Sequence, residues 1–120
     1  MSYIPRALLR RIYVRGSMRV EAGALSFKLR NNLATATVNA PLKLRIDDVD
    51  IDPAQVTISA GGRTIKSSDI SETSTFEIPV GTEVEVRVPG NFPPGRHKVV
   101  VEVSVKGYGK GVLDIEDEAK

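Results

Sequence analysis

The feature that most constrains this chain is an alternation of apolar and polar side chains with a period of two residues. The clearest examples are two valine runs, one at every second position from Val99 to Val105 and one at Val84, Val86 and Val88. Successive side chains of a β-strand point to opposite faces of a sheet, so each run has one apolar and one polar face. The pattern therefore predicts strands that bury one face and expose the other to water.

Turn signals separate such runs along the chain. Similar alternation occurs over residues 25–30 and 42–46, Gly61-Gly62 predicts a two-residue hairpin turn, and Asp47-Asp48 predicts a second tight turn. Residues 5–12 have helical spacing of apolar side chains over two turns at most. We therefore expect an all-β fold, an antiparallel β-sandwich of about seven to nine strands with a short N-terminal helical or extended segment.

The size and composition of the chain fit one domain. Its 120 residues are enough for a single core, and 41% of them are apolar and 27% charged, as in globular proteins. The chain has no cysteine, which excludes disulfides, thiolate metal sites and cysteine nucleophiles. We expect one β-sandwich domain over residues 1–120, with a basic N-terminal arm (1–20) and an acidic tail (112–120).

The sequence also bears on the location of the protein. Arginines interrupt the N-terminal stretch, which therefore lacks the apolar core of a signal peptide. No run approaches the roughly 20 apolar residues that a membrane helix needs. We expect a cytoplasmic protein that does not bind a membrane.

The charges of the chain are distributed unevenly, although the net charge is only +2. No acidic residue precedes Glu21, whereas the last residues are rich in acids. Either the arginines pair with acids of the same chain or of a neighbouring subunit, or they form a basic arm for nucleic acid or an anionic surface. The candidate interaction residues are Arg6, Arg10, Arg11, Arg15, Tyr108, Lys110, Asp114, Glu116 and Asp117.

The only histidine of the chain is His97, just after a Pro-Pro-Gly turn. A metal site needs further ligands, and a catalytic triad needs a serine and an acid beside the imidazole. No such partner is identifiable in the sequence. We expect His97 to be an exposed or half-buried residue at the start of a strand, and we expect no catalytic residue in this chain.

Two further motifs resemble ligand sites without meeting their requirements. Asp48, Asp50 and Asp52 alternate as at the start of a calcium loop, but Pro53 stands where the loop needs a glycine. The segment Gly107–Gly111 has three glycines, but Val112 stands where a dinucleotide site needs its third glycine, and we interpret the segment as a flexible hairpin. We therefore expect no metal and no cofactor.

Five stretches of the chain carry a resemblance to a known family. They are Val14-Arg15-Gly16-Ser17-Met18, Ala24-Leu25-Ser26-Phe27-Lys28-Leu29, Leu44-Arg45-Ile46-Asp47-Asp48, Val56-Thr57-Ile58 and Pro94-Gly95-Arg96-His97-Lys98-Val99. In these stretches, and in the order of its elements, the chain resembles the small β-subunit family of bacterial C-glycoside deglycosidases. The resemblance implies a sandwich that accompanies a larger catalytic subunit and has no catalytic residue of its own.

The acidic segment Leu113-Asp114-Ile115-Glu116-Asp117 carries a second resemblance. It is similar to the ending of a group of small archaeal and bacterial proteins labelled hydroxymethylglutaryl-CoA reductase. A reductase of that kind needs a nucleotide site and a catalytic constellation, and this chain has no motif for either. The second resemblance therefore implies no enzymatic mechanism for this chain.

These observations favour a non-enzymatic β-sandwich that acts as an oligomerising module or as the accessory subunit of an enzyme. In a homo-oligomer, Arg6, Arg10 and Arg11 of one copy would contact Asp114, Glu116 and Asp117 of another. The alternative is a nucleic-acid or anion-binding small β-barrel that uses the N-terminal arginines together with Arg30, Lys43 and Arg45. A carbohydrate-binding sandwich is disfavoured, because the chain has no tryptophan.

Overall fold

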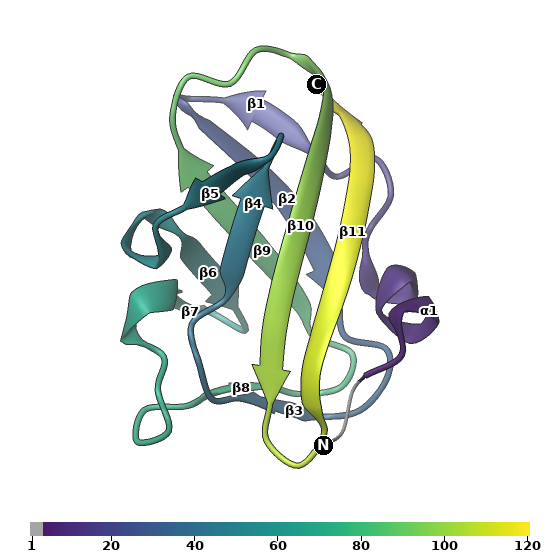
Figure 1. Ribbon diagram of the computed structural model, residues 1–120, viewed down its shortest axis with the longest axis vertical. Helices are drawn as coiled ribbons and strands as arrows, with labels where there is room; N and C mark the ends of the chain where they lie inside the picture. The colour runs from purple at the N-terminus through teal and green to yellow at the C-terminus, as the bar shows by residue number, and fades with distance from the viewer. Residues whose placement is uncertain (1–3) are drawn as a thin grey trace.

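The computed structural model describes residues 4–120 and shows two antiparallel sheets packed face to face (Figure 1). The first sheet has five strands in the order β1-β2-β9-β6-β7. Their bounds are Arg19–Glu21 for β1, Ala24–Arg30 for β2, Glu83–Pro89 for β9, Thr57–Ala60 for β6 and Arg63–Lys66 for β7. This sheet forms one wall of the expected sandwich.

The second sheet has six strands, in the order β5-β4-β10-β3-β8 with β11 on β10. Their bounds are Val49–Ile51 for β5, Lys43–Ile46 for β4, Gly95–Val105 for β10, Ala36–Val38 for β3, Phe76–Ile78 for β8 and Gly109–Ala119 for β11. The two sheets stay separate, which confirms the predicted antiparallel sandwich. The barrel that accompanied the nucleic-acid alternative is wrong.

Helical structure is confined to short pieces. The helix α1 (Arg6–Leu9) continues into the 3₁₀ turn η1 (Arg10–Ile12), as the helical spacing predicted. Two further 3₁₀ turns, η2 (Pro53–Gln55) and η3 (Ser67–Asp69), lie in the connections between strands. Among residues 4–120, no helix is long and apolar enough to cross a membrane.

The alternation in the sequence appears directly as alternating burial. Val84, Val86 and Val88 of β9 are buried, and two of them lie opposite the fully buried Phe27 and Leu25 of β2. Burying one apolar face of each sheet against the other gives the sandwich its core. The two predicted tight turns are also confirmed, because Gly61-Gly62 and Asp47-Asp48 all have positive φ angles.

The number of strands differs from the expected seven to nine, because the structure has eleven. Four of them, β1, β3, β5 and β8, contain three residues each. A three-residue segment is too short to show a period of two. The strand β3 in particular has no signal in the sequence, since it places Ala36 and Thr37 beside a single valine.

The longest element is the hairpin of β10 and β11, which pair over eleven residues each. The segment expected as an acidic tail is the second half of β11. Asp114 and Glu116 alternate there with the buried Leu113 and Ile115, so they lie on the outer face of the sheet. The acidic residues therefore belong to a paired strand rather than to a free end.

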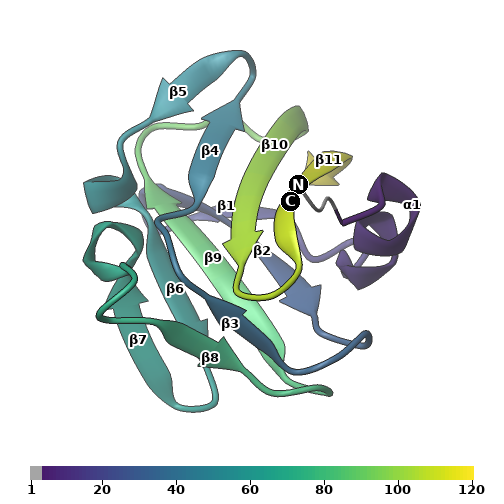
Figure 2. The ribbon, with the colours of Figure 1, turned by 60° about the horizontal axis from the view of Figure 1, so that its bottom comes forward.

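One end of the sandwich is organised differently from the rest. The strand β4 pairs with β10 over four residues, whereas β3 pairs with it only through Val38 and Val105. As a result, β3 and β8 pass across the end of the sandwich near the turn between β10 and β11 (Figures 1 and 2). The candidate site lies at this end.

Candidate functional site

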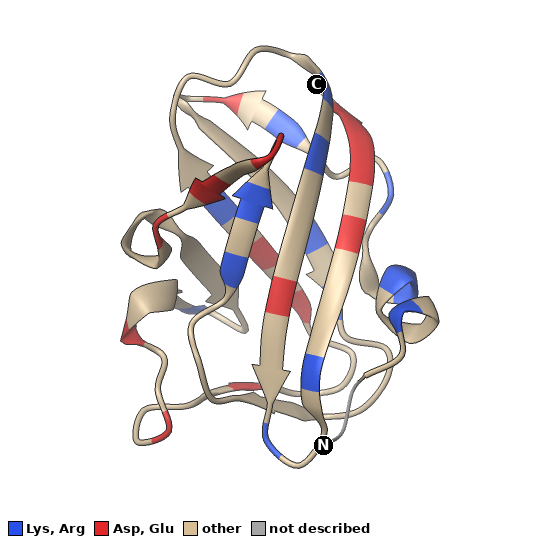
Figure 3. Cartoon of the chain, viewed as in Figure 1, with Lys and Arg blue, Asp and Glu red and all other residues tan. Residues whose placement is uncertain are grey.

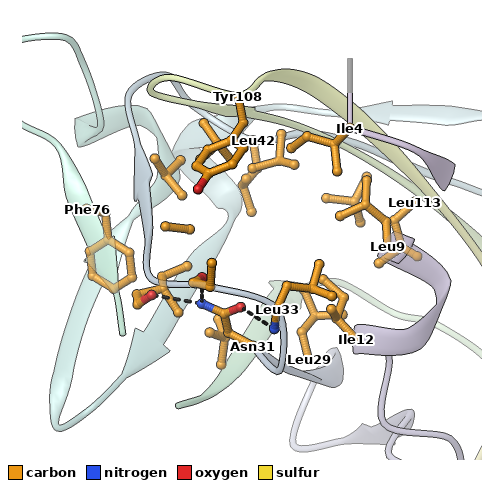
Figure 4. Close-up of a pocket in the computed structure, with 18 of the residues that line it drawn as sticks. Ile4, Leu9, Ile12, Leu29, Asn31, Leu33, Leu42, Phe76, Tyr108 and Leu113 are labelled. Carbon is orange, nitrogen blue, oxygen red and sulfur yellow. Dashed lines mark hydrogen bonds between the residues drawn. The ribbon is translucent and has the colours of Figure 1, made fainter. Parts of the chain in front are cut away.

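A cavity of about 260 Å³ lies between the two sheets, at the end that β3 and β8 cross. Both sheets contribute to its wall, with Val84 and Val86 of β9 on one side and Val101 and Leu113 of the β10–β11 hairpin on the other. The helix α1 and the loop of residues 31–35 complete the wall (Figure 4). The cavity is thus part of the core that the alternating strands create.

The wall of the cavity is almost entirely hydrocarbon. Only Asn31, Thr35 and Tyr108 contribute polar side chains, and none of the lining residues is charged. An apolar wall with very few polar groups is typical of sites that bind the apolar part of a small molecule. It offers no site for a charged group in its interior.

The cavity opens to solvent between three segments. Leu8 of α1, Leu33 of the 31–35 loop and Tyr108 of the β10–β11 turn all line the cavity, and their exposed fractions are 40%, 40% and 54%. Only two other large apolar side chains among residues 4–120 are comparably exposed, Val49 and Val80. The exposed apolar side chains therefore gather at the opening.

The segment before β1 is held against β11 by close packing at a glycine. The backbone N–H of Ile4 donates a hydrogen bond to the carbonyl of Lys110 at 3.0 Å, and Leu9 of α1 is buried. A Cβ atom on Gly111 would lie 2.5 Å from Cδ1 of Leu9 and 3.1 Å from Cβ of Ile4. Gly111 therefore permits the approach that lets α1 form one side of the cavity.

Asn31 shapes the loop on the other side of the opening. Its side-chain amide donates hydrogen bonds to the carbonyls of Ala34, at 2.7 Å, and Ile78, at 2.9 Å, and its Oδ1 accepts one from the backbone N–H of Leu33, at 3.3 Å. These bonds tie the loop both to itself and to β8. Because they use the polar atoms of Asn31, the residue presents little free hydrogen-bonding capacity to the cavity.

Among the predicted interaction residues, one basic and one acidic side chain form an ion pair within the chain. Arg6 pairs with Asp114 at 3.0 Å, whereas Glu116 lies 3.8 Å from Arg96, which is not one of the N-terminal arginines. The Arg6–Asp114 pair fits the interpretation in which the arginines are matched by acids of the same chain. Among the other predicted residues, Arg10, Arg11, Arg15 and Lys110 are exposed, and Tyr108 lies at the cavity opening.

Asp117 has a structural role in the same region. It accepts a hydrogen bond from the hydroxyl of Tyr13 at 2.6 Å and another from the backbone N–H of Gly16 at 2.8 Å. Although burial opposes the shift, these bonds hold the pKa of Asp117 below its usual value, and burial together with Asp117 raises the pKa of Tyr13. Asp117 therefore fastens the segment before β1 to β11.

The further basic residues of the nucleic-acid hypothesis lie in two places. Lys43 and Arg45 lie on β4, where they form ion pairs with Glu102 at 3.7 Å and Asp50 at 2.9 Å. Arg30 lies at the end of β2 beside η1, because its neighbour Leu29 forms a β-bridge with Tyr13. The structure therefore divides these basic residues between β4 and the neighbourhood of η1.

The prediction that His97 is exposed or half-buried is wrong, because only 4% of its surface is exposed. Its Nδ1 lies 2.6 Å from Oδ2 of Asp47, its Nε2 lies 2.6 Å from the carbonyl of Pro93, and Phe92 packs edge-on against the ring. Burial lowers the pKa of His97, but the bonds to Pro93 and Asp47 outweigh burial and raise it above 6.5. The imidazole links three segments far from the cavity and has no open side for a substrate.

The aspartates that resemble a calcium loop also have local partners. Asp50 pairs with Arg45, and Asp52 accepts a hydrogen bond at 2.9 Å from the backbone N–H of Ala54 at the start of η2. Over the described part of the chain, no three His, Cys, Asp or Glu side chains are grouped so that they could hold a metal ion.

The cavity itself is the feature that the sequence did not predict. Its wall combines side chains from Ile4 to Leu113, and the sequence does not show how far apart two sheets are held. The available signals were indirect: Leu33 is a large apolar residue in a loop otherwise made of small and polar ones, and Tyr108 stands between two glycines of a turn.

Comparison with known proteins assigns the chain to a family. Residues 8–120 match the family model described as "Hydroxymethylglutaryl-CoA reductase, N-terminal domain". No curated protein matches the chain significantly. Nothing in these comparisons supports the resemblance to the small subunits of C-glycoside deglycosidases. The label hydroxymethylglutaryl-CoA reductase, carried by the second resemblance, agrees with the family model. The match covers nearly the whole chain, and the chain therefore belongs to the hydroxymethylglutaryl-CoA reductase N-terminal domain family.

Proposed function

We propose that this domain is a non-catalytic binding module that holds the apolar part of one small molecule between its two sheets. The observation that carries the proposal is the cavity of about 260 Å³, with its hydrocarbon wall and its opening bordered by Leu8, Leu33 and Tyr108. A cavity of about 150 Å³ with such a wall is large enough for a benzene ring. The present cavity has room for a larger molecule, such as a medium-length acyl or prenyl chain.

Energetics support an occupied cavity. Contact of this hydrocarbon wall with water is unfavourable, at roughly 25 cal/mol for each Å² of apolar surface. Water molecules in the cavity would make few hydrogen bonds, because a buried water needs two to four polar partners and the wall has few polar groups. A hydrocarbon chain would gain about 0.8 kcal/mol for each methylene group that it buries.

The groups around the cavity support binding rather than catalysis. The lining residues of the cavity include no carboxylate, imidazole or amine. General acid–base catalysis needs such a group within hydrogen-bonding distance of the reacting atoms. Among the lining residues that the structure describes, Tyr108 has the only titratable side chain, and it lies at the opening.

Binding of the neutral apolar dye Nile red tests the proposal. The dye should fluoresce when it enters the cavity, and decanol should displace it. Replacing Ala36, a half-buried residue of β3 that lines the cavity, by leucine and then phenylalanine should fill the space and weaken the dye's affinity in that order. For Ala36→Phe we expect a loss of about tenfold or more, equivalent to about 1.4 kcal/mol.

The matched control is Ala54→Phe, the same change at an exposed residue of η2 that does not line the cavity. It should leave the affinity for Nile red unchanged. Thermal unfolding of each variant shows whether it is folded. The proposal fails if the wild-type chain does not bind the dye, or if the folded Ala36→Leu and Ala36→Phe variants bind it as tightly as the wild type.

Membership of the family supports a second part of the proposal. A domain whose family is named for the N-terminal domain of a reductase would act as an accessory module beside the catalytic part of such an enzyme. Light scattering of the purified chain mixed with a hydroxymethylglutaryl-CoA reductase catalytic part should then detect a complex. Two separate species at every concentration would contradict this part alone.

Self-association has less support, because Asp114 and Glu116 already pair with Arg6 and Arg96 of the same chain. Size-exclusion chromatography with light scattering at low and high salt tests it directly. A dimer that dissociates as salt increases would support contacts between charged residues of two copies. A monomer under all conditions would exclude them.

A further inference from the structure

We infer that the molecule held in the cavity is an amphiphilic anion, whose apolar chain lies between the sheets and whose anionic head group stays at the opening. The inference rests on the proposed function and names the class of ligand. It comes from the distribution of charge around the opening rather than from the volume of the cavity.

The opening is bordered by residues 4–12, the loop 31–35 and the turn region 105–110. These three segments contain five basic residues and no acidic residue. The basic residues are Arg6, Arg10, Arg11, Lys106 and Lys110, and all of them are exposed. Figure 3 shows them on α1 and η1 and at the end of the β10–β11 hairpin, while the acidic residues of β11 lie further along the strand.

The acids nearest to these segments cancel only part of the positive charge. Asp114 pairs with Arg6 at 3.0 Å, and Glu102, which pairs with Lys43 on β4 at 3.7 Å, also lines a shallow surface pocket with Arg6 and Lys110. Two acids thus lie beside the five basic residues of the three segments. Among the described residues, neither Arg10, Arg11, Lys106 nor Lys110 forms an ion pair. The rim of the opening therefore has a net positive charge that an anionic ligand would complement.

The interior of the cavity explains why the charged group would stay outside. No charged residue lines the wall, and the amide of Asn31 is already bonded to Ala34 and Ile78. An unpaired charge in such surroundings is strongly disfavoured. At the rim, by contrast, the head group stays in contact with water, near the exposed side chain of Tyr108 (Figure 4).

Displacement of Nile red by three ligands of equal chain length tests the inference. Decanoate and decyl phosphate carry an anionic head group, whereas decanol is neutral. For the wild-type chain at low salt, both anions should displace the dye at lower concentrations than decanol. Added salt should weaken the two anions and leave decanol unaffected.

Charge-removing variants identify the residues involved. In Lys106→Gln the affinity for decanoate should fall by about two- to fivefold, while that for decanol stays constant. Lys110→Gln should have a smaller effect, because Lys110 lies on the same outer face of β11 as Asp114. The matched control is Lys66→Gln on β7, an exposed lysine outside the three segments that border the opening. This control should leave the affinities for all three ligands unchanged.

The outcomes separate the inference from the function on which it rests. If decanol displaces Nile red as well as decanoate and decyl phosphate do, the inference is overturned while the cavity remains a binding site. If only decyl phosphate or only decanoate is favoured, the inference holds and the type of head group is identified. If neither Nile red nor decanol binds, the proposed function itself fails and the inference fails with it.

Discussion

At the scale of single residues, two polar side chains that the structure takes partly or wholly out of water have partners far away in the sequence, whereas Oδ1 of Asn39 is buried without a hydrogen bond. His97 is bonded to Asp47, 50 positions earlier, and Tyr13 is bonded to Asp117, 104 positions later. Hydrogen bonding of this kind offsets the cost of removing a polar group from water. The residue types alone gave no indication of these pairs, because a histidine or an aspartate without a visible partner looks the same in a turn as in a core.

The stability of the domain should depend on pH through His97 and Asp47. The pKa of His97 is raised above 6.5 in the folded protein. Its contribution to the free energy of unfolding is therefore fully present below about pH 6.5 and is lost as the pH rises through the raised pKa. The pKa of Asp47 is lowered from 3.8, chiefly by the backbone N–H of Lys98 and then by His97, so its contribution is lost only as the pH falls below about 3.8. The pair should therefore stabilise the fold most between these limits.

Urea unfolding of the wild type and of His97→Gln over this range measures the effect. The variant should be less stable by about 1–3 kcal/mol under mildly acidic conditions. The difference should shrink as the pH rises above 6.5, because the wild type then loses the charged pair. A difference that stays constant across neutral pH would show that His97 contributes by packing alone.

A single Cβ atom at Gly111 should disturb the packing of α1. In Gly111→Ala the new methyl group would lie 2.5 Å from Cδ1 of Leu9. We expect a loss of about 1–3 kcal/mol in the free energy of unfolding, as for other overpacked sites. The same change in a Leu9→Ala background should cost less, since the closest atom is then absent. Additive effects in this double-mutant cycle would mean that Gly111 and Leu9 do not interact.

At the scale of elements, the sequence predicted what depends on neighbouring residues and missed what depends on distant ones. The strands β9 and β10 and the Gly61-Gly62 turn followed from local patterns. The three-residue strand β3 did not, because it exists only through its pairing with β8 and β10. The continuation of β11 beyond Ile115 was not predicted, since the one buried apolar side chain there is the small one of Ala119. The cavity could not be predicted for the same reason, because it combines side chains of β3, β9, β10 and β11.

The loop of residues 31–35 should depend on Asn31 for its conformation. Asn31→Ala removes three hydrogen bonds, to Ala34, Ile78 and Leu33, and should cost about 1–3 kcal/mol. It should also speed hydrogen exchange in the loop, because the contacts that order it are lost. The control is Asn32→Ala, which removes one exposed hydrogen bond of 3.3 Å to the carbonyl of Arg11 and should have a much smaller effect. Equal effects of the two variants would contradict the role of Asn31.

At the scale of the whole molecule, the two ends of the sandwich differ. At the end opposite the cavity opening, Lys120 exchanges backbone hydrogen bonds with Met18 and Val20, at 3.2 and 3.1 Å, which link β11 to the segment of β1 in the other sheet. At the opening, the sheets are separated by the cavity and bridged by β3, β8 and α1 (Figure 2). A ligand would therefore add contacts at the end where the cavity separates the two sheets.

Ligand binding should raise the unfolding temperature of the whole domain, because the ligand binds only the folded state. At a free concentration of about 100 times Kd, one bound molecule adds about 2.7 kcal/mol. Differential scanning fluorimetry with increasing decanol should show a rise of several degrees, and Ala36→Phe should show a much smaller one. A rise of equal size in both chains would indicate a general solvent effect rather than occupation of the cavity.

The position of Lys120 also determines where a tag or a surface can be attached to the protein without blocking the cavity opening. The C-terminal residue lies at the far end of the longest axis from the opening, whereas Ile4 lines the cavity (Figure 1). A biotin or an affinity tag placed after Lys120 would leave the entrance clear, and a sensor surface could hold the domain with its entrance facing the solution. The same groups joined before Ile4 would emerge beside the entrance and compete with any ligand for it.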